Sequence, residues 1–407
     1  MTAEIIGIGT ELLLGQIANT NAKFISEELS QIGIAVYSHT AVGDNHTRIK
    51  SAFDHAFSKA DIIIATGGLG PTLDDISKEV AADYFGLDMI LHEESMRAIE
   101  KRFNNRKLPE NVSRNAMIPT ESIVLPNLHG SAPGVVIEKN DKILILLPGP
   151  PSEMEPMFKK YVIPYLQKKS ESVFISRTLK ITGIGESTLE KIIEDMVINQ
   201  SNPTIAPYAK ITEVHLRVTA AAKHESEAKN LLEPVIKEIY KRVGKYIYAE
   251  GDTTLAKVIL DKLKKQSLTL STAESCTGGL LAAGFIAEPG ASDCFKESMI
   301  TYSNESKINR LFISKDIINN HGAVSEQTAL EMAKNMAKIS GTDIAISTTG
   351  IAGPTGATKD KPIGLVYIGL YIKGDLKVKK FNIIGSRNEI RQRAVVYAMD
   401  MLRKNLI

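Results

Sequence analysis

Apolar and polar positions alternate along the first 150 residues in a pattern that predicts strands and helices in turn. Apolar runs with strand character cover residues 4–8, 35–40, 61–65 and 142–147, and helical spacing covers residues 19–31, 47–58 and 76–85. Strands that alternate with helices build α/β domains with a mostly parallel sheet, which bind ligands beyond the carboxyl ends of their strands. We therefore predict an N-terminal α/β domain over residues 1–169, with ligand-binding loops at residues 66–72 and 147–151.

The pattern changes near residue 170 and again near residue 251. Expected elements at 177–182, 187–196, 213–221 and 226–243 alternate strand and helix, so residues 170–250 are predicted to form a small α+β module. Residues 251–407 are predicted to form a second α/β domain that opens with a helix at 254–265. Its strands are expected at 268–271, 299–302, 344–348, 364–372 and 377–383. A last helix, 387–402, carries Ile390, Ala394, Ala398 and Met401 on one face.

Length, composition and charge limit the classes of function. The 407 residues exceed one ordinary hydrophobic core, and 43% apolar with 24% charged residues is typical of globular protein. The net charge is only +2 and the basic residues are dispersed, so the sequence shows no basic patch of the kind that binds nucleic acid or membranes. Cys276 and Cys294 are too few for a disulfide framework, and no stretch reaches about eighteen apolar residues. We predict a cytoplasmic protein that binds neither nucleic acid nor membranes.

A candidate nucleophile lies between a predicted strand and a predicted helix, in the segment Thr-Ala-Glu-Ser-Cys-Thr-Gly-Gly at residues 272–279. A serine at such a turn lies near free backbone N–H groups. Ser275 could pair with Lys307, a desolvated neutral lysine that takes the serine proton, while the amides around Gly278 and Gly279 stabilise an oxyanion. The alternative is that Ser275 caps the helix and the glycines allow close packing.

Two neighbouring side chains bear on this pair. Cys276 is a rival nucleophile at the same helix start. Tyr302 precedes Lys307 by five residues, and its phenol could relay a proton or hold the lysine neutral. The alternative for Tyr302 is a strand residue that packs its ring.

Candidate substrate-binding residues follow the predicted strand at 344–348 and begin the last helix. Thr349, Gly350 and Gly353 could contact a ribose phosphate or an amide, or simply form a tight loop. Arg387 and Arg391, four residues apart, could hold a phosphate as a fork, or could be solvated like most exposed helical arginines.

The N-terminal region offers a glycine loop, Thr-Gly-Gly-Leu-Gly-Pro-Thr-Leu-Asp-Asp, at residues 66–75. Glycines allow close approach of the backbone to a phosphate, and a helix start supplies unpaired N–H groups. Asp74 and Asp75 add hard oxygen ligands for a hydrated divalent cation, although they could instead cap the following helix.

Three further polar residues are candidates for the same cleft. Glu11 follows a lone Gly-x-Gly, which is weak evidence for a nucleotide site. Asn21 could contact a sugar or a base, or belong to a capped helix start. Glu153 follows a proline-rich turn and could face the cleft, although prolines and glycines there also simply end a strand.

These motifs together resemble the CinA family (competence/damage-inducible protein A). Residues 9–17, 19–21, 66–75, 130–134 and 148–154 resemble its molybdopterin-binding-like domain. Residues 272–279, 302–307 and 348–354 resemble its C-terminal domain, the nicotinamide-mononucleotide (NMN) deamidase. Both sets occur in the order of the family, and the match runs from end to end.

The resemblance implies a bifunctional hydrolase and homodimer of pyridine-nucleotide recycling. ADP-ribose would be split to AMP and ribose 5-phosphate, and NMN would be hydrolysed to nicotinate mononucleotide and ammonia. It implies Ser275 as the nucleophile, activated by Lys307 and Tyr302. For the N-terminal domain we expect a divalent metal (Mg, Mn or Co) at Asp74 and Asp75, whose carboxylates are hard oxygen ligands. Potassium is a further possible cofactor of the N-terminal domain, and no cofactor is expected for the C-terminal domain. The expected substrate-binding residues are Cys276, Thr277, Gly278, Gly279, Thr349, Gly350, Gly353, Arg387 and Arg391, and in the N-terminal domain Glu11, Asn21, Thr66, Gly67, Gly68, Gly70, Thr72 and Glu153.

Two departures qualify the resemblance. The middle module is similar to a KH fold, but Gly183-Ile184-Gly185-Glu186 lacks the Gly-x-x-Gly spacing that clamps nucleic acid, so a structural or dimer-forming spacer is expected. Ser386 stands where the family often has an acidic residue. Two alternative functions are a molybdopterin-type binder without catalysis and an accessory protein of DNA uptake or repair.

Overall fold

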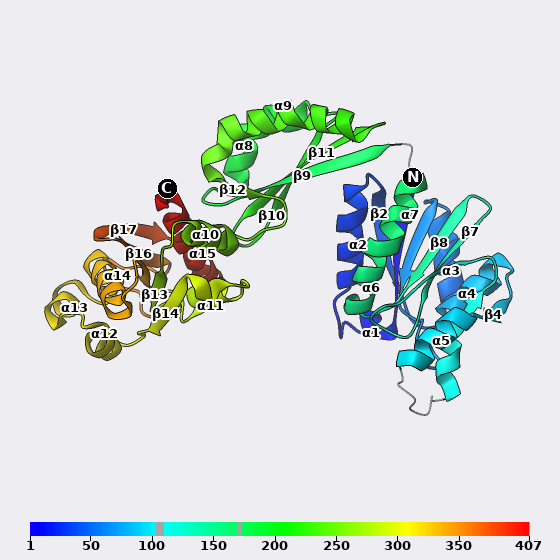
Figure 1. Cartoon of the computed structure of the whole chain (residues 1–407), viewed down its shortest axis with the longest axis horizontal. Helices are drawn as coiled ribbons and strands as arrows, with labels where there is room; N and C mark the ends of the chain where they lie inside the picture. The colour runs from blue at the N-terminus through cyan, green and yellow to red at the C-terminus, as the bar shows by residue number, and fades with distance from the viewer. Residues whose placement is uncertain (103–109, 170–171, 407) are drawn as a thin grey trace. The chain divides into compact units, whose positions relative to one another are not determined.

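The computed structural model describes residues 1–102, 110–169 and 172–406. Figure 1 follows the chain through its helices and strands. Residues 1–176 with 219–231 form one compact unit, and residues 177–218 with 232–407 form another. The predicted boundary at residue 170 and the end of the last predicted domain at residue 407 lie outside the described residues.

A six-stranded sheet with the order β2-β1-β3-β8-β7-β6 organises the N-terminal domain. The strands β2, β1, β3 and β8 run parallel to one another. β7 pairs antiparallel with β8, and β6 pairs antiparallel with β7. The strands are β1 (Thr2–Ile8), β2 (Ala35–Val42), β3 (Ile62–Thr66), β6 (Ile123–Leu125), β7 (Gly134–Lys139) and β8 (Lys142–Leu147). Nearly all residues of β1 and β3 are buried because helices cover both faces of the sheet. The predicted α/β domain with a mostly parallel sheet is confirmed.

Helices cover the two faces of this sheet in separate sets (Figure 1). On one face, α2 (Thr20–Gln31), α6 (Pro151–Met157) and α7 (Ile163–Lys169) pack on Ile5, Ile62 and Ile64. On the other, α3 (His46–Phe57) and α4 (Ser77–Phe85) pack on Ile6, Ile63 and Ala65. The remaining elements are α1 (Thr10–Leu13), β4 (Met89–Leu91), α5 (Glu93–Arg102), a 3-10 turn (Glu110–Ala116), β5 (Met117–Pro119) and a π-helical turn (Phe158–Val162).

The middle module has a four-stranded sheet with the order β10-β11-β9-β12. Its elements are β9 (Val173–Ile181), α8 (Glu186–Ile198), β10 (Thr204–Ala209), β11 (Val214–Ala222), α9 (Glu225–Val243), a 3-10 turn (Gly244–Tyr246) and β12 (Ile247–Glu250). The four elements expected from the sequence are present, and β10 and β12 are additional. The α+β character of the module is confirmed.

The C-terminal sheet has the order β14-β13-β15-β16-β17. The strands β13 (Leu270–Glu274), β14 (Phe295–Ile300) and β15 (Ile344–Gly350) are parallel, whereas β16 (Leu365–Ile372) and β17 (Asp375–Asn382) are antiparallel. One face is covered by α10 (Leu255–Lys265), α11 (Leu280–Ile286) and α15 (Arg387–Asn405). The other is covered by α12 (Asn304–Leu311), α13 (Lys315–His321) and α14 (Glu326–Ser340). A 3-10 turn spans Ala291–Asp293.

Two expectations for this domain need correction. The strand expected at 268–271 ends at Glu274, so Ser275 follows it directly. The strand expected at 299–302 is β14 (Phe295–Ile300), whose polar residues Lys296, Glu297 and Ser298 are compatible with an edge strand that pairs only with β13. The predicted buried face of the last helix is confirmed, because Ile390, Ala394, Ala398 and Met401 are all buried.

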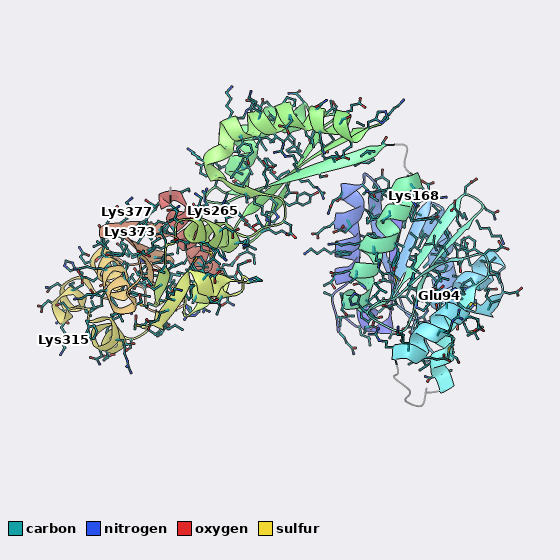
Figure 2. The ribbon with its side chains drawn as sticks, in the orientation of Figure 1. Glu94, Lys168, Lys265, Lys315, Lys373 and Lys377 are labelled. Carbon is teal, nitrogen blue, oxygen red and sulfur yellow. The ribbon has the colours of Figure 1, made fainter. Side chains whose placement is uncertain are left out.

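Basic side chains are spread over the surface, as the sequence predicts. Lys168, Lys265, Lys315, Lys373 and Lys377 are exposed and come from different elements and loops (Figure 2). Among the described helices, none combines the length and the apolar composition that crossing a bilayer requires.

Candidate active site

Ser275 and Lys307 meet at the carboxyl edge of the C-terminal sheet. Ser275 directly follows β13, and Lys307 lies in α12, whose first turn is capped by Ser303. The Nζ of Lys307 lies 3.0 Å from Ser275 Oγ, 2.9 Å from the carbonyl oxygen of Thr301 and 3.2 Å from that of Tyr302. The predicted pair therefore comes together although 32 residues separate its members.

Burial gives this lysine the properties of a base. Lys307 is 1% exposed, and desolvation lowers its pKa from 10.5 to about 8. A neutral amine keeps two N–H groups and one lone pair. The two carbonyl oxygens can only accept, so they take the N–H groups and leave the lone pair for the Ser275 hydroxyl. In this geometry the neutral amine can remove the serine proton.

The structure bears on both alternatives for this turn, the helix cap and the rival nucleophile Cys276. α11 begins at Leu280 with Gly279 as its N-cap and without a side-chain cap, so Ser275 does not cap the helix. Burial raises the pKa of the Cys276 thiol to about 12. A thiol that stays protonated is a poor nucleophile, which favours Ser275 over Cys276.

The two amides expected to stabilise an oxyanion are already engaged. The N–H of Gly278 donates to the carbonyl of Ser275 at 3.2 Å, and the N–H of Gly279 donates to Glu274 Oε2 at 2.9 Å. The expectation that these N–H groups are free at the helix start is therefore wrong. It failed because the sequence pattern does not show that the preceding carboxylate folds over the turn.

Tyr302 contacts Lys307 through its main chain, and its phenol points elsewhere. The carbonyl oxygen accepts from Lys307, whereas the side chain is 63% exposed and its hydroxyl lies 3.3 Å from Arg387 Nη2. A proton relay through the phenol would require its hydroxyl to lie beside the lysine, and the structure does not place it there.

Of the expected substrate-binding residues at the end of β15 and the start of α15, Arg391 contacts the turn of Ser275, and the others contact neighbouring segments. Arg391 Nη2 donates to the carbonyl of Thr277 at 2.9 Å, and Arg387 Nη1 donates to that of Gly353 at 2.5 Å. Thr349 is buried and donates from Oγ1 to the Ala323 carbonyl. Gly350, like Thr349, belongs to β15, where a Cβ would lie 2.7 Å from the Leu365 carbonyl oxygen.

Sequence reasoning missed one residue of this site, Glu274. Its carboxylate is 0% exposed and accepts hydrogen bonds from the turn that follows Ser275. A signal existed, because acidic residues favour helix N-termini and Glu274 directly precedes the nucleophile.

In the N-terminal domain, three expected residues line one cavity of about 290 Å³. Glu11, Asn21 and Thr66 face it together with Asn19 and Gly149. Asn19 caps α2 by accepting a hydrogen bond from the N–H of Ala22. The alternative of a capped helix start is therefore correct for Asn19. Asn21 is only 8% exposed; its Nδ2 donates to the Gly149 carbonyl at 2.7 Å, and its Oδ1 has no partner within the described chain.

The glycine loop beside this cavity is tightly folded. Gly67 has a φ of +106°, and a Cβ there would lie 2.0 Å from the carbonyl oxygen of Ile8, so only glycine fits. The Ser77 hydroxyl donates to the carbonyl of Gly67 at 2.9 Å, and the Ser77 N–H donates to that of Gly68 at 3.0 Å. Gly70 lies against the carboxylate of Asp75.

Asp74 and Asp75 differ in what they can offer a metal. Asp75 Oδ2 accepts from the Thr72 N–H at 3.0 Å and from its hydroxyl at 2.5 Å, whereas Asp74 is exposed. Neither caps α4, whose N-cap is Ile76 without a side-chain hydrogen bond. The described residues contain no cluster of three or more potential His, Cys, Asp or Glu ligands. Hard carboxylate oxygens of this kind fit a cation such as Mg²⁺ that keeps most of its water or phosphate ligands.

A buried lysine that the sequence did not single out supports this loop from outside. Lys78 donates to the carbonyls of Asn115 at 2.8 Å and Arg114 at 3.3 Å, and burial lowers its pKa to about 8. Arg114 in turn donates to the carbonyl of Thr72 at 2.6 Å. The segment around Arg114 therefore fixes the loop that carries Asp74 and Asp75.

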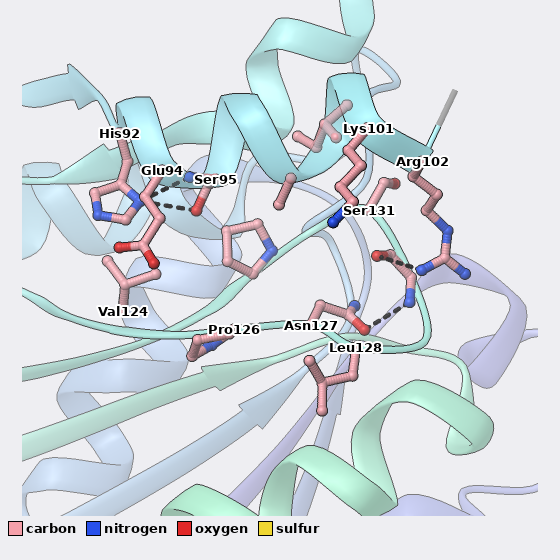
Figure 3. A pocket seen from close by; sticks show the side chains of 14 residues that line it. His92, Glu94, Ser95, Lys101, Arg102, Val124, Pro126, Asn127, Leu128 and Ser131 are labelled. Carbon is pink, nitrogen blue, oxygen red and sulfur yellow. Dashed lines mark hydrogen bonds between the residues drawn. The ribbon is translucent and has the colours of Figure 1, made fainter. Parts of the chain in front are cut away.

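Glu153 is not among the residues that line the Glu11–Asn21 cavity. Its carboxylate accepts from Asn127 Nδ2 at 2.7 Å. Asn127 also lines a second cavity, of about 550 Å³, between α5 and residues 124–133 (Figure 3). His92, Lys101 and Arg102 face this cavity, and the sequence pattern did not single out any of the three.

Three family models match successive parts of the chain. They are a probable molybdopterin binding domain at residues 4–168, the damage-inducible protein CinA KH domain at 176–249 and the CinA C-terminal domain at 252–406.

Relatives match over the whole length. A protein named as competence-damage inducible from Clostridium novyi (strain NT) is 52% identical over 100% of this chain and 99% of its own. A CinA-like protein from Dictyoglomus thermophilum is 52% identical over 100% of both chains. A solved CinA superfamily protein from Klebsiella pneumoniae is 32% identical, covers 37% of this chain and 95% of its own, and has a TM-score of 0.37. The three matched domains in their order and the full-length identity show that the chain belongs to the CinA family.

Proposed function

We propose that the C-terminal domain hydrolyses the carboxamide of NMN to nicotinate mononucleotide and ammonia. The observation that carries this proposal is the contact of 3.0 Å between Lys307 Nζ and Ser275 Oγ, made by a lysine whose pKa is lowered to about 8. A serine with a neutral amine as its base is a nucleophile suited to acyl transfer.

In the first half-reaction, Ser275 Oγ attacks the carboxamide carbon while its proton passes to Lys307 Nζ. The tetrahedral intermediate collapses when the C–N bond breaks and the Lys307 ammonium returns the proton to the departing nitrogen. Ammonia leaves, and the nicotinoyl group stays as an ester of Ser275. Lys307 is then neutral again.

In the second half-reaction, a water molecule attacks the ester carbonyl and gives its proton to Lys307. The bond to Ser275 Oγ breaks, Lys307 protonates the serine oxygen, and the carboxylic acid is released. Arg391 contacts the turn of Ser275 through the Thr277 carbonyl, and Arg387 contacts the Gly353 carbonyl and the Tyr302 hydroxyl. Because a guanidinium has several N–H donors, each arginine keeps some for the phosphate of the nucleotide.

The lowered pKa of Lys307 predicts the pH dependence of the reaction. Since the base must be unprotonated, kcat/KM for NMN should rise about tenfold per pH unit up to about pH 8 and then level off. Measuring kcat/KM across this range tests the assignment. A profile that is flat or falls toward alkaline pH would show that Lys307 is not the base.

We also propose that the N-terminal domain hydrolyses ADP-ribose to AMP and ribose 5-phosphate. The supporting observation is the cavity at the carboxyl edge of the sheet, where Asn21 Oδ1 is buried without a partner among the described residues and could accept from a ribose hydroxyl or an adenine amine. The adjoining glycine loop allows a phosphate to approach its backbone.

A divalent cation supplies Lewis-acid polarisation of a phosphoryl oxygen when it is bound. Asp74 would hold this cation with its exposed carboxylate, and Asp75 fixes the loop through Thr72. The residues of the cavity would bind and orient the nucleotide.

Separate incubations of the purified chain with NMN and with ADP-ribose, analysed by chromatography, test both activities. Formation of nicotinate mononucleotide supports the first proposal, and formation of AMP with ribose 5-phosphate supports the second. ADP-ribose that is bound but not cleaved would favour a binding role for the N-terminal domain.

A further inference from the structure

Glu274 is the most completely buried carboxylate near the nucleophile, and hydrogen bonds surround it. Its Oε2 accepts from Thr277 Oγ1 at 2.6 Å, from the Gly279 N–H at 2.9 Å and from the Leu281 N–H at 3.1 Å. Its Oε1 accepts from the Ala282 N–H at 2.8 Å. The side chain thus spans the turn from the nucleophile to the first residues of α11.

These donors compensate the cost of burying the charge. An ionised carboxylate withdrawn from water requires an ion pair or several hydrogen bonds. No basic side chain pairs with Glu274 among the described residues, and three backbone N–H groups at the start of α11 take that place. Such hydrogen bonds to a charged acceptor are among the stronger ones in proteins.

The main chain of the same residue holds the segment that positions the base. The carbonyl of Glu274 accepts from the Thr301 N–H at 2.8 Å, and the Thr301 carbonyl accepts from Lys307 Nζ at 2.9 Å. The N–H of Ser275 donates to the Thr348 carbonyl at 2.9 Å. One residue therefore connects the serine turn with the carbonyl that orients the lysine.

We infer that Glu274 is a positioning residue that fixes the Ser275 turn so that the serine Oγ faces Lys307 Nζ. The inference rests on the proposed amide hydrolysis. Glu274 touches neither the substrate nor the reacting atoms, and it acts by holding residues 277–282 against the end of β13. Substitution by glutamine keeps the size but directs an NH₂ group at N–H donors that need an acceptor.

Asp343 provides a matched control at the opposite end of the same strands. Its Oδ2 accepts from the N–H of Thr269 at 2.9 Å and from the Thr269 hydroxyl at 2.8 Å, just before β13 and β15 begin. Asp343→Asn therefore also replaces a carboxylate that joins β13 and β15, without touching the turn of Ser275.

The experiment compares kcat, KM and the melting temperature of both variants in the full chain. Glu274→Gln should lower kcat for NMN at least about 100-fold with KM within about threefold, because misplacement of reacting groups affects the chemical step. Asp343→Asn should lower the melting temperature but keep both constants within about threefold. Equal kcat in the two variants would overturn the inference.

Two further measurements keep the test decisive. If Glu274→Gln does not fold, Thr277→Val removes one donor to the carboxylate, together with the hydrogen bond between Thr277 and Thr348, and should lower kcat about tenfold. An unchanged kcat would overturn the inference. The rate at which a fluorophosphonate probe labels Ser275 needs no NMN. If wild type is labelled but does not deamidate NMN, the proposed substrate fails, and equal labelling of Glu274→Gln and wild type then overturns the positioning role.

Discussion

Ser275→Ala and Lys307→Ala should each lower kcat for NMN deamidation at least about 10³-fold, and the double variant should be no slower than either single one. Removal of either group abolishes the same step, because the serine cannot lose its proton without the amine that lies 3.0 Å away. Steady-state rates of the three purified variants test this expectation.

Cys276→Ala is the control from the same turn. Because burial keeps the thiol protonated, with its pKa raised to about 12, this variant should retain activity within about fivefold of wild type. A fully active Ser275→Ala, together with an inactive Cys276→Ala, would make the protein a thiol amidohydrolase and refute the account.

Chelation should separate the two proposed activities. A strong chelator should lower ADP-ribose cleavage at least about 100-fold, because the proposed mechanism uses a divalent cation held by Asp74. NMN deamidation should stay within about twofold, since Ser275 and Lys307 supply its nucleophile and base. Parallel assays with and without chelator, followed by addition of Mg²⁺ or Mn²⁺, measure the difference.

The outcome that contradicts this division is a parallel loss of both activities. Asp74→Asn offers a matched variant, because the exposed side chain can change without loss of a buried contact. It should reproduce the effect of the chelator on ADP-ribose cleavage and leave NMN deamidation unchanged.

Much of the fold could be predicted because its central strands have continuous apolar runs. β3 and β8 have such runs and are buried on both faces, so they are recognisable in one sequence. Strands of three residues, such as β4 and β6, carry too little periodicity to be predicted. The edge strand β14 was misplaced because half-exposed polar residues interrupt its pattern.

The candidate site shows a similar division. The pairing of Ser275 with Lys307 was predicted from motif and spacing, and the structure brings the two atoms into contact. The direction of the Tyr302 phenol and the engagement of the Gly279 amide depend on tertiary contacts that no local pattern contains. Glu274 was missed because its place before a helix start indicates an acidic residue there but does not show that its side chain is buried over the turn.

In the N-terminal domain, the sequence identified residues that lie in one cavity and others that do not. Glu11, Asn21 and Thr66 follow different strands or open the next helix, and the parallel order of the sheet brings them together. Glu153 was expected in the same cleft, but its carboxylate pairs with Asn127, which belongs to a segment without a recognisable motif. The support of the loop that carries Asp74 and Asp75 by Lys78 and Arg114 likewise arises from packing alone.

The central claim is that Ser275 carries the acyl group during amide hydrolysis. Acid quenching during turnover of NMN, followed by mass spectrometry of the peptide that contains residues 272–279, tests it most directly. The account predicts that the peptide gains the mass of NMN less ammonia, with fragmentation placing the adduct on Ser275. An adduct on Cys276 would contradict it.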